Sequence, residues 1–103
     1  MITVHAHFGY LVLVVLAGFG IYFLASQNLP RWRAAAVGLL DLEILLGLIA
    51  YFTLAPAARP VWWHPAVGIV VAVLAHIAPR WGARAYGAVL LVGAVLIFLL
   101  RPV

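Results

Sequence analysis

Histidine and carboxylate side chains are the ones with which this chain could do chemistry, because it contains no cysteine. His5 and His7 stand near the start of one apolar stretch, and His64 stands near the start of another. Two neutral imidazoles that face each other across a helical bundle are the usual axial ligands of a b-type haem iron. Positions two apart on a helix point about 200° away from each other, so only one of His5 and His7 can face inward. We expect the deeper His7 to pair with His64, and His5 is the alternative ligand.

Several side chains near this pair could hold the rest of a haem. Arg59 and Arg101 are expected on the same side of the bundle, and guanidinium groups bind carboxylates such as haem propionates in a bidentate manner. Trp62 and Trp63 would flank the porphyrin edge or anchor at the lipid headgroups. Gly68 would leave room for a flat cofactor. The alternative interpretation of the whole set is a group of interfacial histidines and of arginines that extend to the headgroups.

Asp41 and Glu43 are the only acids in the chain, and both lie within an apolar segment. Ionisable side chains in such a place are costly and are therefore functional candidates. They face nearly opposite ways, so one could pair with an arginine or with His76 while the other faces a partner subunit. They could instead bind a quinol hydroxyl, relay a proton or hold a metal ion. His76 lies about 18 Å beyond His64 along a helix, so one haem cannot use both, and we expect it to hydrogen-bond in preference to binding metal.

The elements that must position these residues are four apolar segments. The chain is 69% hydrophobic and 8% charged, which is typical of a protein that has lipid as its solvent. A helix needs about 20 residues to cross the hydrocarbon, with a range of roughly 17–25. We therefore predict an all-α, four-helix transmembrane bundle that forms one domain over residues 1–103. Because the connections are short, the helices should run up, down, up and down, with approximate ranges 6–25, 34–54, 62–78 and 85–100.

The positive charges predict an orientation in the membrane. The net charge of +4 comes from arginines at the edges of the apolar segments, which indicates membrane anchoring and excludes a nucleic-acid interface. Four arginines fall on the side expected to be cytoplasmic: Arg31, Arg33, Arg80 and Arg84. Arg59, Arg101 and both termini then lie on the periplasmic side of a bacterial inner membrane. No basic residue precedes the first apolar segment, so we expect that segment to be retained and not removed as a signal peptide.

Three short motifs resemble those of a known family. They are His5-x-His7-x-Gly9, the run from Leu42 to Phe52, and Trp63-His64-Pro65. Together they are similar to the pattern HxHSG, HxQxLxGLxLYF and EHP of small bacterial four-helix membrane proteins that are usually labelled cytochrome-b-like. The resemblance covers nearly the whole chain. It implies a haem-binding membrane bundle.

The chain also departs from that family pattern. Phe8 stands in place of the serine, Asp41-x-Glu43 in place of His-x-Gln, and Trp63 in place of the glutamate. The second segment therefore lacks the family histidine and is not expected to supply a haem ligand. His7 and His64 match family positions, in agreement with the ligand pair proposed above.

These observations predict a b-type haem protein that transfers electrons or senses a redox-active ligand. Its expected partners are the lipid bilayer and a quinone, a membrane redox complex or a second copy of the chain. No nucleophile–base pair, phosphate-binding loop or zinc motif is visible, so a carrier is favoured over an enzyme. The first alternative is a cofactor-free accessory subunit of a larger membrane complex. The second is a transition-metal binding or transport protein that uses the histidines.

Overall fold

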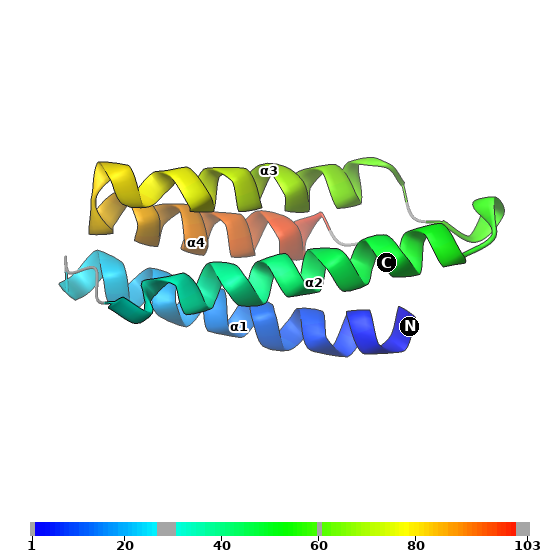
Figure 1. Cartoon of the computed structure of the whole chain (residues 1–103), viewed down its shortest axis with the longest axis horizontal. Coiled ribbons are helices and arrows are strands. Elements are labelled where there is room, and N and C mark those ends of the chain that lie inside the picture. Colours follow the sequence, from blue (N-terminus) through cyan, green and yellow to red (C-terminus); the bar gives the residue numbers. More distant parts are fainter. Residues whose placement is uncertain (1, 27–30, 60, 101–103) are drawn as a thin grey trace.

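Four long helices make up most of the protein. The computed structural model describes residues 2–26, 31–59 and 61–100 (Figure 1). The long helices are α1 (Ile2–Ser26), α2 (Ala34–Thr53), α3 (Trp63–Ile77) and α4 (Ala83–Leu99). Three short 3-10 helices lie in the connections: η1 (Arg31–Arg33), η2 (Pro56–Ala58) and η3 (Ala78–Trp81). Within the described ranges there is no strand, and the predicted all-α class is confirmed.

The helices lie side by side along a long axis of 44 Å. Successive helices run in alternating directions in Figure 1, so each connection turns the chain back on itself. α1 packs on α2 and α4, and α3 packs on the same two helices. The diagonal helices α1 and α3 do not pack backbone against backbone in the described part of the chain. Space between diagonal helices must therefore be filled by side chains or by a ligand.

The helix boundaries are close to those predicted, with one difference that matters for the site. α1 begins at Ile2 and not near residue 6, so the residues before position 6 are already helical. No proline or glycine interrupts this stretch, which allows the helix to continue toward the N-terminus. Pro65 lies in the first turn of α3, where a missing N–H is tolerated. Gly82, which has a φ of 104°, precedes α4 in a conformation that favours glycine.

Two glycines bring α1 and α4 into close contact. A Cβ atom on Gly20 would lie 2.8 Å from the carbonyl oxygen of Gly87, and one on Gly87 would lie 2.7 Å from that of Gly20. Small residues let helices approach this closely. The two glycines permit tight helix packing at this crossing, which fixes the face that α1 turns to its neighbours.

The core is centred on large side chains from α1 and α4. Leu16, Phe23, Tyr86 and Leu90 are fully buried. The Tyr86 hydroxyl donates a hydrogen bond of 2.6 Å to the carbonyl oxygen of Arg33, so the polar end of this ring is satisfied. This contact ties α4 to the start of α2.

Much of the outer surface is apolar. Large hydrophobic side chains are exposed on all four helices, among them Val14, Ile21, Leu45, Phe52, Val70 and Val92. By length and composition, α1 from Thr3 to Ser26 and α2 could each cross a membrane. α4 is also apolar but shorter, with 17 residues.

The arginines gather at the two ends of the bundle. The α1–α2 and α3–α4 connections lie at one end, and the α2–α3 connection lies at the other (Figure 1). Arg33, Arg80 and Arg84 are therefore at the first end, together with the backbone of Arg31, and Arg59 is at the second. Arg101, which we predicted at the second end, lies outside the described residues.

Candidate cofactor site

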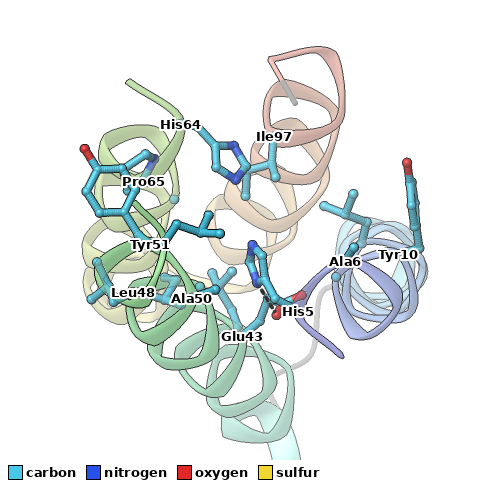
Figure 2. Close-up of a pocket in the computed structure, with 17 residues that line it drawn as sticks. His5, Ala6, Tyr10, Glu43, Leu48, Ala50, Tyr51, His64, Pro65 and Ile97 are labelled. Carbon is cyan, nitrogen blue, oxygen red and sulfur yellow. Dashed lines mark hydrogen bonds and ion pairs between the residues drawn. The ribbon is translucent and has the colours of Figure 1, made fainter. Parts of the chain in front are cut away.

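An apolar cavity of about 370 Å³ lies within the bundle (Figure 2). This volume falls in the range of about 300–1,000 Å³ that is typical of small-molecule and cofactor pockets. All four helices contribute to the lining, mostly with apolar or small side chains. The polar side chains among them are His5, Tyr10, Glu43, Tyr51 and His64. The cavity therefore suits an apolar ligand that is held by a few polar groups.

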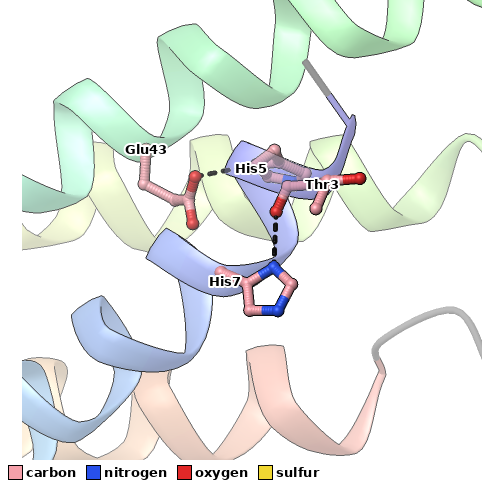
Figure 3. A network of polar contacts seen from close by, with 4 residues as sticks. All are labelled: Thr3, His5, His7 and Glu43. Carbon is pink, nitrogen blue, oxygen red and sulfur yellow. Dashed lines mark hydrogen bonds and ion pairs between the residues drawn. The ribbon is translucent and has the colours of Figure 1, made fainter.

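One of these histidines is held by a carboxylate of the neighbouring helix. Nδ1 of His5 on α1 lies 2.8 Å from Oε1 of Glu43 on α2 (Figure 3). The side chains are 20% and 10% exposed, so the pair is enclosed. Because an ionised carboxylate only accepts, Nδ1 of His5 donates and Nε2 of a neutral ring is left to bind an electrophile. A carboxylate that holds a histidine in this way is the usual outer-shell partner of a metal-binding histidine.

Two glycines make room for this pair. A Cβ atom on Gly9 would lie 2.5 Å from Oε2 of Glu43, and one on Gly47 would lie 2.7 Å from Cε1 of His5. Gly9 follows His5 by one helical turn, and Gly47 follows Glu43 by the same interval, so each helix presents one functional side chain and one gap. In the described part of the chain, Oε2 of Glu43 is buried and has no hydrogen-bond partner. The enclosed pair thus keeps one acceptor atom unused.

His64 faces His5 from α3. The centroids of the two rings are 6.2 Å apart and the ring planes are inclined by 67°. Figure 2 shows the His5 ring between Glu43 on one side and His64 on the other. His64 is partly buried and lines the same cavity. Two imidazoles from the diagonal helices α1 and α3 therefore meet inside the bundle.

The prediction that His7 faces the core is wrong. Its side chain is exposed, and its Nδ1 bonds to the carbonyl oxygen of Thr3 within the same helix, at 2.9 Å (Figure 3). His5 takes the inward position that we had given to His7. The reason is the close α1–α4 packing, which sets the rotation of α1 so that His5 and Gly9 point toward α2.

The structure brings some of the other predicted cofactor contacts to the cavity and leaves others away from it. Gly68 lines the cavity. Trp62 and Trp63 are 71% and 46% exposed and stack edge to face on each other, and neither lines the cavity. Nε of Arg59 donates to the carbonyl oxygens of Tyr51 (2.9 Å) and Leu54 (3.2 Å), so it closes the end of α2 beside the cavity.

The remaining acid and histidine form a second pair. Nε2 of His76 on α3 lies 2.8 Å from Oδ2 of Asp41 on α2, which is one of the pairings considered from the sequence. The side chains are 55% and 44% exposed, so this pair lies at the surface of the bundle. A smaller hollow of about 230 Å³ adjoins His76 and is lined also by Arg33, Pro79 and Tyr86.

The donor set at the enclosed site can be tested against a bound metal. A metal between two imidazole nitrogens at about 2.0–2.1 Å each would put the ring centroids about 6 Å apart. The ring centroids of His5 and His64 are 6.2 Å apart, a separation of this size. The described residues contain no group of three or more His, Cys, Asp or Glu side chains that could hold a metal. His5 and His64 are therefore the side chains at this cavity that would hold a metal-containing cofactor.

Comparisons with known protein families, with curated proteins and with solved structures find no match to this chain. The site must therefore be interpreted from its own geometry.

Reasoning from the sequence missed the residues that surround the two histidines and Glu43. Gly9 and Gly47 were not connected with the histidine and the acid that they accommodate, and Tyr10 and Tyr51 were not expected in the lining. The spacing of one helical turn between each polar residue and its glycine is visible in the sequence. The sequence does not show which side chain of the opposite helix fills each gap, because that depends on how the helices pair.

Proposed function

We propose that this protein is a membrane-embedded b-type haem protein in which His5 and His64 are the axial ligands. The observation that carries the proposal is the pair of facing imidazoles, 6.2 Å apart in an apolar cavity, with one ring held by Glu43. This replaces the His7–His64 pair expected from the sequence with a pair that shares one cavity.

The surface of the bundle supports a location in the membrane. Large apolar side chains cover the outside of the helices, and the arginines lie at the two ends. In this arrangement α1 and α2 cross the bilayer fully, and the shorter helices α3 and α4 cross with the help of flanking residues. The end with Arg33, Arg80 and Arg84 faces the cytoplasm of a bacterium, and the haem end faces the periplasm.

Each residue of the site has a defined task in this proposal. Glu43 holds the His5 ring in one tautomer and one orientation, which keeps Nε2 directed into the cavity. His64 would supply the second nitrogen ligand, and the lining of the cavity is mostly apolar. A bound haem would supply one-electron chemistry, with a potential tuned by its ligands and by burial. Electrons would come from or go to a quinone or a membrane redox complex.

The direct test is an absorption spectrum of the detergent-purified protein, oxidised and then reduced with dithionite. We expect a Soret band, and sharp α and β bands on reduction, as two histidine ligands produce. His5→Ala and His64→Ala should lose these bands. His7→Ala and His76→Ala are matched controls in the same helices and should keep them, because neither side chain lines the cavity. Loss of the bands in His7→Ala but not in His5→Ala would contradict the assignment.

A second candidate function is an accessory subunit without a cofactor. Asp41 favours it, because a carboxylate that is 44% exposed on an apolar bundle could be covered by a helix of another protein. A protein that stays colourless after haem is added and copurifies with other membrane subunits would support this candidate. A colourless protein that binds copper through His5 and His64 would instead support metal binding.

A further inference from the structure

A hollow at the arginine-rich end of the bundle is separate from the cofactor cavity. It has a volume of about 230 Å³ and lies where the start of α2, the end of α3 and the start of α4 meet. Its polar lining consists of Arg33, His76 and Tyr86, and its apolar lining includes Val37 and Pro79. The Tyr86 hydroxyl donates to the backbone of Arg33, and the side chains of Arg33 and His76 carry the N–H groups of the lining.

The charge around this hollow is strongly positive. Arg33, Arg80 and Arg84 are exposed at this end. The chain has only two acids, and one of them, Glu43, is committed to His5 at the other site. The second, Asp41, accepts from His76. An anion that enters the hollow therefore meets more positive than negative charge.

The two polar side chains offer complementary hydrogen bonds. A guanidinium presents a planar fork that matches two oxygens of a phosphate. A protonated imidazole has two donors. When His76 carries both protons, Nε2 donates to Asp41 and Nδ1 can donate to a further acceptor. Asp41 thereby acts as a positioning residue for the ring and does not itself contact the anion.

We propose that this hollow binds the phosphate of an anionic phospholipid headgroup. The proposal rests on the membrane location proposed above, because only then do lipid headgroups lie at this end of the bundle. Trp32 and Trp81, which are 46% and 65% exposed, mark the same level, as aromatic side chains do at membrane interfaces. Basic pockets between helices on the cytoplasmic side are suited to such headgroups.

The test is native mass spectrometry of the detergent-purified protein after incubation with phosphatidylglycerol or phosphatidylcholine. We expect wild type to retain phosphatidylglycerol in preference to phosphatidylcholine. Arg33→Gln should reduce this retention about five-fold, which corresponds to one basic residue near an anionic headgroup. His76→Gln should reduce it as well. Arg59→Gln removes the same charge at the opposite end of the bundle and should leave retention unchanged.

Each alternative outcome has a distinct meaning. Equal retention of the two lipids, or equal loss in Arg33→Gln and Arg59→Gln, would overturn the proposal. Displacement of the lipid by millimolar inorganic phosphate would assign a free-phosphate site in its place, and a retained second protein would assign a helix partner. Circular dichroism checks that each variant is helical. The haem bands are measured separately, so a colourless protein that binds phosphatidylglycerol would contradict the haem proposal while supporting this one.

Discussion

The His5–Glu43 pair and the Asp41–His76 pair place the same hydrogen bond in opposite surroundings. In both, a carboxylate of α2 holds an imidazole of a neighbouring helix at 2.8 Å. The first pair is enclosed, with side chains 20% and 10% exposed, and the second is open, at 55% and 44%. Burial makes the first hydrogen bond stronger and makes the loss of either member more costly. The hydrogen bond of the exposed pair competes with other polar groups around it, so its loss costs less.

What lies beyond the imidazole differs even more. His5 faces a second imidazole across an apolar cavity, whereas His76 lies beside a hollow that is lined by Arg33. The first arrangement can offer the lone pairs of neutral imidazoles to a metal, and in the second Arg33 can offer N–H donors to an anion. A histidine–carboxylate pair therefore does not define a function by itself. The groups on the far side of the imidazole and the burial of the pair determine what it can bind.

The largest difference in haem content between the two regions should follow from replacing one glycine of α2 by alanine. Gly47→Ala would put a Cβ atom 2.7 Å from Cε1 of His5, so the ring or the helix must move. We expect this variant to lose bound haem to the level of His5→Ala. Gly38→Ala is the matched change one turn before Asp41, where nothing lies within 4 Å, and it should keep full haem content. The pyridine haemochrome assay on purified protein measures both.

The same comparison can fail in a defined way. If Gly47→Ala and Gly38→Ala retain equal amounts of haem, His5 is not held in the tight gap described above. The enclosed pair would then have no special role in cofactor binding.

The error over His7 shows where prediction from sequence stops. α1 is apolar on every side, so hydrophobicity does not indicate which face turns inward. The buried positions Val12, Leu16 and Gly20 recur at helical spacing, and His5 precedes Val12 by two turns, which puts it on the same face. That face is selected by the Gly20–Gly87 crossing. A contact between the first and last helices is not visible in either segment alone.

Other features were accessible from the sequence for physical reasons. The length of the apolar segments predicted the four helices, because a long uninterrupted apolar run favours one helix. The pairing of Asp41 with His76 was among the expected alternatives, since both are polar groups in apolar helices that seek partners. The link between Glu43 and His5 was not predicted, because it depends on the register of α1 against α2.

A smaller difference, in haem affinity and in the free energy of unfolding, should follow from removing each carboxylate. Glu43→Ala leaves His5 without its outer-shell partner in an apolar cavity, so we expect haem affinity to fall about 10–100-fold. The free energy of unfolding should fall by about 1–3 kcal/mol, as for a buried polar group that loses its hydrogen bond. Asp41→Ala breaks an exposed pair and should cost about 0–1 kcal/mol, with no change in haem affinity.

Haem titration and denaturant unfolding in detergent measure these two quantities. Equal losses of stability in Glu43→Ala and Asp41→Ala would show that burial does not distinguish the two pairs. Glu43→Gln sharpens the result, because it keeps the shape and an acceptor oxygen while removing the charge. It should retain more haem than Glu43→Ala.

The smallest expected difference in the free energy of unfolding is between substitutions of the arginines at the two ends of the bundle. Nε of Arg59 donates to the carbonyl oxygens of Tyr51 and Leu54, which satisfies acceptors at the end of α2 beside the enclosed cavity. Arg59→Gln should therefore lower the free energy of unfolding by about 0.5–1.5 kcal/mol, the net worth of a typical hydrogen bond. Arg80→Gln is the matched change at an exposed site of the arginine-rich end. It should change the free energy of unfolding by no more than about 0.5 kcal/mol. A larger loss in Arg80→Gln than in Arg59→Gln would mean that the arginine-rich end contributes more to folding than the end that holds the cavity.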